Sequence, residues 1–191
     1  MQKLKLVFSS ANSKLLFNFT FANFLTAVRL CLAPVIFYYV ILGQQLVAFA
    51  LFFLASLTDF LDGYWARKTH TISLLGGILD PLADKFLVAF IYAGLAYAGK
   101  IPLWLATLVL LRDVLILLGI FYIYYRSIPL TIMPIISSKI NTFFQLLLCV
   151  TLLLPFHVYE GFIQGLIYVT FISTVYSGGA YAGIFIKTLR K

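Results

Sequence analysis

Long apolar runs separated by short polar breaks make up most of the chain. No charged residue occurs from Leu30 to Thr58, and the polar break Gly43-Gln44-Gln45 divides that run in two. A helix needs about 20 mostly apolar residues to cross a bilayer, so this run predicts two membrane-spanning helices. The same pattern along the whole chain predicts six helices, at 22–42, 46–67, 75–98, 102–125, 139–155 and 162–186.

The breaks between these helices carry turn residues and charges. They are the Gly43 turn, the polar segment 67–73, the turn Lys100-Ile101-Pro102, the proline-bearing connector 126–139 and the turn 155–161. No internal repeat or second domain is evident, so residues 20–191 are predicted to form one all-α integral membrane domain. Residues 1–19 carry three lysines among apolar residues. They are interpreted either as an amphipathic helix on the membrane surface or as a basic tail.

The composition supports the membrane class. Hydrophobic residues make up 63% of the 191 residues and charged residues only 10%, and the mean hydropathy is +1.04. A soluble domain carries roughly 25% charged residues, so an ordinary soluble protein is excluded. Cys31 and Cys149 stand in apolar stretches and suggest packed side chains, because two such cysteines form neither a disulfide framework nor a zinc pattern.

The positive charges lie on one side of the predicted helices. The net charge is +8, but the basic residues are scattered between apolar runs, which argues against nucleic acid as a partner. Six spans place both termini on one side, and only Lys100 falls on the other. By the positive-inside rule both termini and the loops 67–74 and 126–139 are expected in the cytoplasm. The membrane would be the inner membrane of a bacterium or of a mitochondrion.

Four of the six acidic residues lie within 26 positions, at Asp59, Asp62, Asp80 and Asp84. The first pair is spaced i,i+3 and the second i,i+4, so each pair lies on one face of a helix. Converging carboxylates repel one another unless cations lie between them, and oxygen ligands suit Mg²⁺, Mn²⁺ or Ca²⁺. The alternative is that these residues cap helix ends or form ion pairs with Arg67 and Lys85.

The surroundings of the acidic residues favour phosphoryl transfer. Gly63, Ala66 and Gly76 are small and permit close approach of a ligand, and Arg67 and Lys85 add positive charge. Metal held by carboxylates, together with basic side chains, neutralises phosphate oxygens and aligns the attacking and leaving groups.

The acidic segment as a whole resembles the motif of the CDP-alcohol phosphotransferases. It runs Asp59-x2-Asp62-Gly63-x2-Ala66-Arg67-x8-Gly76-x3-Asp80-x3-Asp84. The resemblance implies a six-helix membrane protein, usually a homodimer, with its site open to the cytoplasmic face. It also implies transfer of a phosphatidyl group from CDP-diacylglycerol to an alcohol, with release of CMP.

The same resemblance implies roles for the motif residues. Asp59, Asp62, Asp80 and Asp84 match metal ligands for Mg²⁺ or Mn²⁺, and Asp84 also matches the general base that acts on the acceptor hydroxyl. The positions that match CDP-binding residues are Asp62, Gly63, Ala66, Arg67 and Gly76.

The acceptor is suggested by segments outside the motif. Asn23-Phe24-Leu25-Thr26-x2-Arg29 is similar to the branch that makes phosphatidylglycerophosphate and cardiolipin. Ile120 and Asn141 stand where phosphatidylglycerophosphate synthases carry basic residues, and Ser138-Lys139-x-Asn141-Thr142 looks more like the eukaryotic-type cardiolipin synthases. We therefore expect phosphatidylglycerol as acceptor, with glycerol-3-phosphate as the alternative. The candidate acceptor-binding residues are Arg29, Lys85, Arg112, Lys139 and Asn141.

Two of these candidates have simpler interpretations. Arg112 and Asp113 could form a structural pair between helices, and Lys139 could be an ordinary flanking lysine. A function of another class, a small cation or proton transporter, would also explain intramembrane carboxylates. The position of the acids toward one face and the lack of an inverted repeat weigh against it.

Overall fold

The computed structural model of the protein describes the backbone of residues 21–69, 74–125, 136–156 and 158–189. Side chains are described for residues 26–58, 82–119, 122, 136–156 and 158–186. Six helices form this part of the chain, and it contains no strand. They are α3 (Phe21–Ile41), α4 (Gln45–Thr69), α5 (Leu74–Tyr97), α6 (Leu103–Tyr125), α7 (Ile136–Leu153) and α8 (Glu160–Leu189).

The predicted all-helical fold and the six predicted helices are confirmed, with shifted ends. Helix α7 begins at Ile136, three residues before the predicted start, and α8 continues to Leu189. Ser138 belongs to the first turn of α7 rather than to the predicted connector, and its hydroxyl accepts a hydrogen bond from Arg112 of α6. A polar residue whose hydroxyl is bonded inside the protein can lie on a packed helix. The predicted N-terminal segment 1–19 lies outside the described residues.

Two glycines end helices in the same way. Gly43 and Gly99 have φ values of 71° and 70°, the left-handed conformation that glycine adopts without strain. The next residue in each case donates its N–H back five positions: Gln44 to the Tyr39 carbonyl at 3.0 Å, and Lys100 to the Leu95 carbonyl at 2.9 Å. These bonds satisfy carbonyls at the helix ends. The chain can therefore reverse tightly after α3 and after α5.

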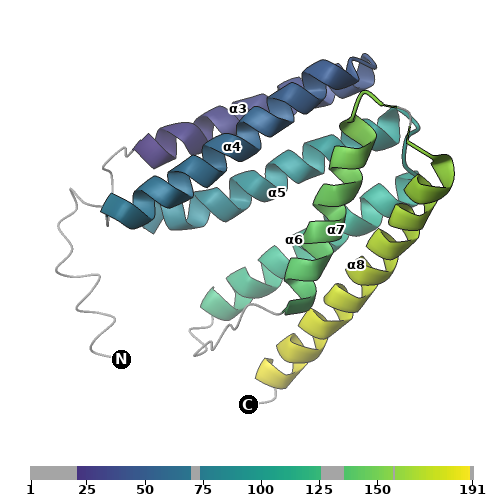
Figure 1. The fold of residues 1–191 in the computed structure, drawn as a ribbon. Coiled ribbons are helices and arrows are strands. Elements are labelled where there is room, and N and C mark those ends of the chain that lie inside the picture. Colours follow the sequence, from purple (N-terminus) through teal and green to yellow (C-terminus); the bar gives the residue numbers. More distant parts are fainter. Residues whose placement is uncertain (1–20, 70–73, 126–135, 157, 190–191) are drawn as a thin grey trace.

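The helices form two groups that share one end of the molecule. Helices α3, α4 and α5 lie along one another, and α7 packs on α8, while α6 contacts both α5 and α8. The connections α3–α4, α5–α6 and α7–α8 gather at one end (Figure 1). A Cβ on Gly94 would lie 3.2 Å from side-chain carbons of Phe37 and Val40, so glycine lets α5 approach α3 closely.

The apolar core occupies the half of the bundle next to these three connections. Each helix contributes residues three or four positions apart, such as Ile36 and Val40 of α3 and Ile91 and Leu95 of α5. The other half buries polar side chains. Those described are Thr26, Arg29, Arg112, Asp113, Asn141, Gln145, Thr174 and Ser177.

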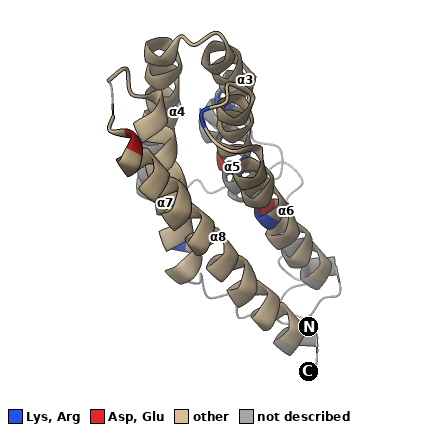
Figure 2. Cartoon of the chain, turned by 90° about the vertical axis from the view of Figure 1, so that its right-hand side faces the viewer, with Lys and Arg blue, Asp and Glu red and all other residues tan. Residues whose placement is uncertain are grey.

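The outer surface is largely apolar. Among the residues whose side chains are described, charged positions are few along the ribbon (Figure 2), and large apolar side chains such as Leu111, Leu115 and Ile172 are more than half exposed. Among the described residues, Ile136–Leu153 and Glu160–Ile186 are long and apolar enough to cross a membrane. The described part of the structure thus combines an apolar exterior with an interior that is polar in one half only.

Candidate active site

The motif residues occupy the polar half of the bundle. Asp59, Asp62, Gly63, Ala66 and Arg67 belong to the second half of α4, and Gly76, Asp80 and Asp84 to the first half of α5. The helical spacing assumed for both Asp pairs is thus confirmed. Of these eight, only the Asp84 side chain is described. No group of three or more metal-ligating side chains occurs among the described ones, and the convergence of the four carboxylates stays a prediction.

Asp84 is paired with Arg29 of α3. Arg29 Nη1 donates to Asp84 Oδ1 at 2.8 Å, and the two side chains are 1% and 54% exposed. A buried guanidinium is costly without a negative partner, so this pair stabilises Arg29 inside the bundle. The carboxylate keeps half of its surface open. The structure therefore brings a predicted acceptor-binding residue to the predicted general base.

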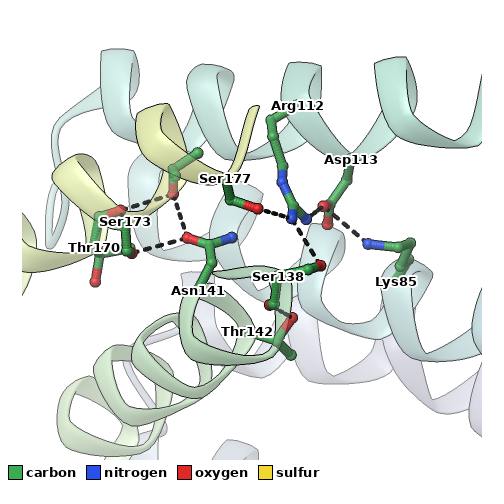
Figure 3. Close-up of polar contacts among 10 residues, drawn as sticks. Lys85, Arg112, Asp113, Ser138, Asn141, Thr142, Thr170, Ser173 and Ser177 are labelled. Atoms are coloured by element: carbon green, nitrogen blue, oxygen red, sulfur yellow. Dashed lines mark hydrogen bonds and ion pairs between the residues drawn. The ribbon is translucent and has the colours of Figure 1, made fainter. Parts of the chain in front are cut away.

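Lys85, which follows Asp84 in α5, forms an ion pair with a different residue, Asp113 of α6. Its Nζ lies 2.9 Å from Asp113 Oδ1, and the same oxygen accepts a hydrogen bond from Arg112 Nη1 at 2.6 Å. Figure 3 shows the three side chains converging from α5 and α6. Asp113 therefore serves two cations at once, and its single negative charge links the two helices.

Arg112 extends this network to α7 and α8. Its Nη2 donates to Ser138 Oγ at 2.9 Å and also to Ser177 Oγ (Figure 3). The guanidinium carbon lies 5.7 Å from the centre of the Tyr181 ring, within the range of a cation–π interaction. Arg112 and Asp113 thus form an ion pair within α6, in line with the simpler interpretation of Arg112. The role of Arg112 in binding the acceptor stays a prediction. Most of the hydrogen-bonding capacity of Arg112 is used within the protein.

Asn141 is a buried residue of α7, and hydroxyl groups of α8 contact one end of its amide. Ser173 Oγ and Thr174 Oγ1 donate to Asn141 Oδ1 at 2.9 and 2.8 Å. Lys139 is exposed two positions earlier, and no ion pair joins it to a described side chain. Residues two apart on a helix do not share a face. The structure therefore brings Asn141, but not Lys139, toward the buried network of Arg112.

Helix α8 contributes polar side chains that were not among the predicted site residues. Thr170, Thr174 and Ser177 are fully or almost fully buried, and with Tyr181 they follow a spacing of three or four residues. That spacing places them on one helical face. It was a usable signal in a helix that otherwise carries few polar residues. Gln145 was also missed as a site residue, although it is buried one turn after Asn141.

Comparison with known proteins gives a consistent result. A family model described as CDP-alcohol phosphatidyltransferase matches residues 19–176. The human cardiolipin synthase (CMP-forming) is 39% identical over 145 residues, which are 68% of this chain and 48% of that protein. The rat protein of the same name is 38% identical over 156 residues, which are 73% of this chain and 52% of the relative.

A relative with a different acceptor in its name is also similar. The CDP-diacylglycerol–glycerol-3-phosphate 3-phosphatidyltransferase of Aquifex aeolicus is 38% identical over 125 residues, which are 64% of this chain and 68% of that protein. The chain spans about half the length of the two mammalian cardiolipin synthases.

The family match covers most of the chain and includes the whole acidic motif from Asp59 to Asp84, together with Arg29, Arg112 and Asn141. The resemblance drawn from the motif is thereby confirmed, and the chain belongs to the CDP-alcohol phosphatidyltransferase family.

Proposed function

We propose that the protein transfers a phosphatidyl group from CDP-diacylglycerol to phosphatidylglycerol, forming cardiolipin and releasing CMP. The observation that carries the proposal is the Asp84 carboxylate, which is half exposed, belongs to the family motif and is held at 2.8 Å by the buried Arg29. A fixed, accessible carboxylate is what an attacking hydroxyl needs as a proton acceptor. Names of relatives include both cardiolipin synthase and glycerol-3-phosphate phosphatidyltransferase.

The proposed reaction needs one proton acceptor and one leaving group. The acceptor hydroxyl oxygen forms a bond to the phosphorus of the phosphatidyl group. The bond from that phosphorus to the CMP oxygen breaks, and CMP leaves with the electron pair. Asp84 takes the hydroxyl proton, and Arg29 keeps the carboxylate in place. Asp62, Gly63, Ala66, Arg67 and Gly76 would hold the CDP moiety.

Members of this family generally depend on a divalent metal ion. The donor set at hand consists of carboxylates, and hard cations such as Mg²⁺ and Mn²⁺ prefer oxygen ligands. Asp59, Asp62, Asp80 and Asp84 would hold the ion. When bound, it would neutralise charge on the diphosphate and orient it for attack.

Phosphatidylglycerol is favoured over glycerol-3-phosphate by the charges of the described residues. Lys85 and Arg112, two predicted acceptor-binding cations, share the carboxylate of Asp113. Asn141 is uncharged, and its side-chain oxygen contacts the hydroxyl groups of Ser173 and Thr174. A dianion needs several uncommitted positive charges, whereas phosphatidylglycerol carries a single negative charge. This arrangement therefore suits the less charged acceptor.

We place the protein in a membrane as six spans, with both termini and the site on the cytoplasmic side. Support comes from the many large apolar side chains that are exposed on the described helices, and from the sequence bias of basic residues. Bacterial inner or mitochondrial inner membrane is the proposed location, and a homodimer the proposed assembly. Native mass spectrometry from detergent tests the dimer.

The function is tested by CMP release from CDP-diacylglycerol in detergent, with phosphatidylglycerol and with glycerol-3-phosphate as acceptors. Release only with phosphatidylglycerol supports the proposal, and release only with glycerol-3-phosphate moves the protein to the alternative. Absence of CMP release with both acceptors, in a folded protein supplied with Mg²⁺ and Mn²⁺, would favour the transporter. Detergent abolishes any ion gradient, so transport cannot mimic the product.

A further inference from the structure

Two buried carboxamides lie one turn apart on α7. Asn141 and Gln145 are 0% and 2% exposed, and Asn141 Nδ2 and Gln145 Nε2 have no hydrogen-bond partner among the described residues. Side chains spaced i,i+4 lie on one helical face, with Cβ atoms about 5–6 Å apart. Buried polar groups are nearly always hydrogen-bonded. Two unbonded amide nitrogens on one face of α7 therefore suggest that a polar ligand binds between them and the rest of the bundle.

One end of the Asn141 amide lacks a hydrogen-bond partner in either orientation of the amide. Ser173 and Thr174 contact the amide end that faces α8, but their hydroxyls also lie 3.0 and 2.7 Å from the Thr170 carbonyl. Each hydroxyl has one proton to donate. Whether oxygen or nitrogen meets these hydroxyls, the other end of the amide points away from them, toward the Arg112 side in Figure 3.

Gln145 lies one turn further along α7 than Asn141, and the two carboxamides together form a polar strip on this face of the helix. Its backbone carbonyl accepts a hydrogen bond from Tyr92 Oη of α5 at 3.2 Å, so this turn of α7 packs against the Tyr92 side chain. Helices α5 and α7 both end at the three gathered connections and therefore run in the same direction. Asp84 is eight residues before Tyr92, or about 12 Å along the helix at 1.5 Å per residue. Asn141 is four residues before Gln145 in the parallel helix α7, so it lies nearer than Gln145 to the end of the bundle where Asp84 is found.

A hydroxyl group is the ligand that matches this strip. It donates and accepts, so it satisfies either end of an amide. An anion suits the two carboxamides less well, because two of the described cations, Lys85 and Arg112, share the carboxylate of Asp113. The acceptor in the proposed function ends in a glycerol, which has a secondary hydroxyl beside the attacking primary hydroxyl.

We propose that Asn141 and Gln145 recognise the secondary hydroxyl of the acceptor glycerol and thereby determine specificity for a vicinal diol. The inference rests on the proposed function. The strip holds the glycerol on the side of Asp84 that faces the interior, with the primary hydroxyl directed to the carboxylate. A primary alcohol without the neighbouring hydroxyl leaves both amides unbonded and reacts more slowly.

The test compares phosphatidylglycerol with phosphatidyl-1,3-propanediol, which retains the phosphate, the acyl chains and the primary hydroxyl. We expect Gln145→Met and Asn141→Leu to lower kcat/KM for phosphatidylglycerol about tenfold or more. For the propanediol lipid the same variants should stay within about twofold of wild type. Thr151→Val is the matched control, since Thr151 is a buried polar residue of α7 that bonds its own helix at the Leu147 carbonyl. It should not distinguish the two acceptors.

Equal losses with both acceptors would overturn the inference, because they indicate a structural role, and so would unchanged kinetics. CDP-lipid binding by each variant verifies folding, and Gln145→Leu replaces Gln145→Met if the latter fails to bind. Should wild type prefer glycerol-3-phosphate, the comparison uses 3-hydroxypropyl phosphate, and the same outcomes decide. A wild-type protein that turns over no glycerol acceptor refutes the proposed function itself, a result distinct from a lost preference for the diol.

Discussion

Arg29 of α3 and Asp84 of α5 form an ion pair across 55 positions of sequence, with 2.8 Å between Nη1 and Oδ1. One partner is buried and the other half exposed, so the pair orients a carboxylate toward an accessible space and leaves it available. The carboxylate can serve the reaction while the guanidinium supports it from inside the bundle.

Asp84→Asn should lower the rate of CMP release about a thousandfold or more, because an amide cannot take the hydroxyl proton. Asn keeps the size of the side chain and still accepts a hydrogen bond from Arg29. Binding of CDP-diacylglycerol should be largely spared, since three other carboxylates of the motif remain. Loss of that binding, measured with a labelled CDP-lipid, would contradict the assignment of Asp84 as general base.

Arg29→Met should destabilise the protein less than Asp84→Ala. The first change leaves a half-exposed carboxylate that water can solvate, and the second takes a carboxylate from a buried guanidinium. A difference of about 1–3 kcal/mol is expected between them. Thermal unfolding of both variants in the same detergent measures it. If Arg29→Met were the more destabilising change, burial of the two side chains would not determine the loss of unfolding free energy.

Asp113→Asn should lower the thermal stability by about 2–4 kcal/mol, because Lys85 and Arg112 both lose their shared negative partner. Adding Lys85→Met should restore part of the loss, since one of the two excess positive charges is then gone. Lys139→Met is the control on an exposed lysine and should change stability by no more than about 0.5 kcal/mol. Additive losses in the double variant would argue against a shared carboxylate.

Asn141→Lys should shift acceptor preference toward glycerol-3-phosphate. Lysine supplies the buried positive charge that Asn141 lacks, and a dianion gains more from it than a phosphodiester does. The ratio of kcat/KM for glycerol-3-phosphate over phosphatidylglycerol should rise about tenfold. Asn141→Leu removes the amide without adding charge, and its ratio should not rise. A folded Asn141→Lys protein with the wild-type ratio would remove Asn141 from the specificity determinants.

Removal of divalent metal with EDTA should stop CMP release, and Mg²⁺ or Mn²⁺ added in excess should restore it, because four carboxylates of the motif are proposed to hold the ion. Activity that persists in exhaustively chelated protein would contradict the metal proposal. A matched experiment with Asp80→Asn should give a weaker apparent affinity for the restoring ion.

The sequence predicted the helices well because apolar runs of bilayer length leave little choice of structure. It predicted less about partners. Lys85 meets Asp113, 28 positions away, because of how α5 and α6 are rotated about their axes, and a hydropathy pattern does not contain that rotation. Serine and threonine are harder still. Thr151 bonds its own helix, whereas Ser177 bonds Arg112, and a lone hydroxyl in an apolar helix is compatible with both outcomes.

The apolar core at the end with the three connections has a consequence for permeability. A polar interior would leak ions if it continued through the bilayer. In this bundle, Ile36, Phe52, Ile91 and Leu105 close that end with side chains that are at most 5% exposed. In the proposed membrane setting, substrates therefore enter and leave from one face only. An enzyme built this way can carry out charged chemistry at membrane depth without discharging the gradient across that membrane.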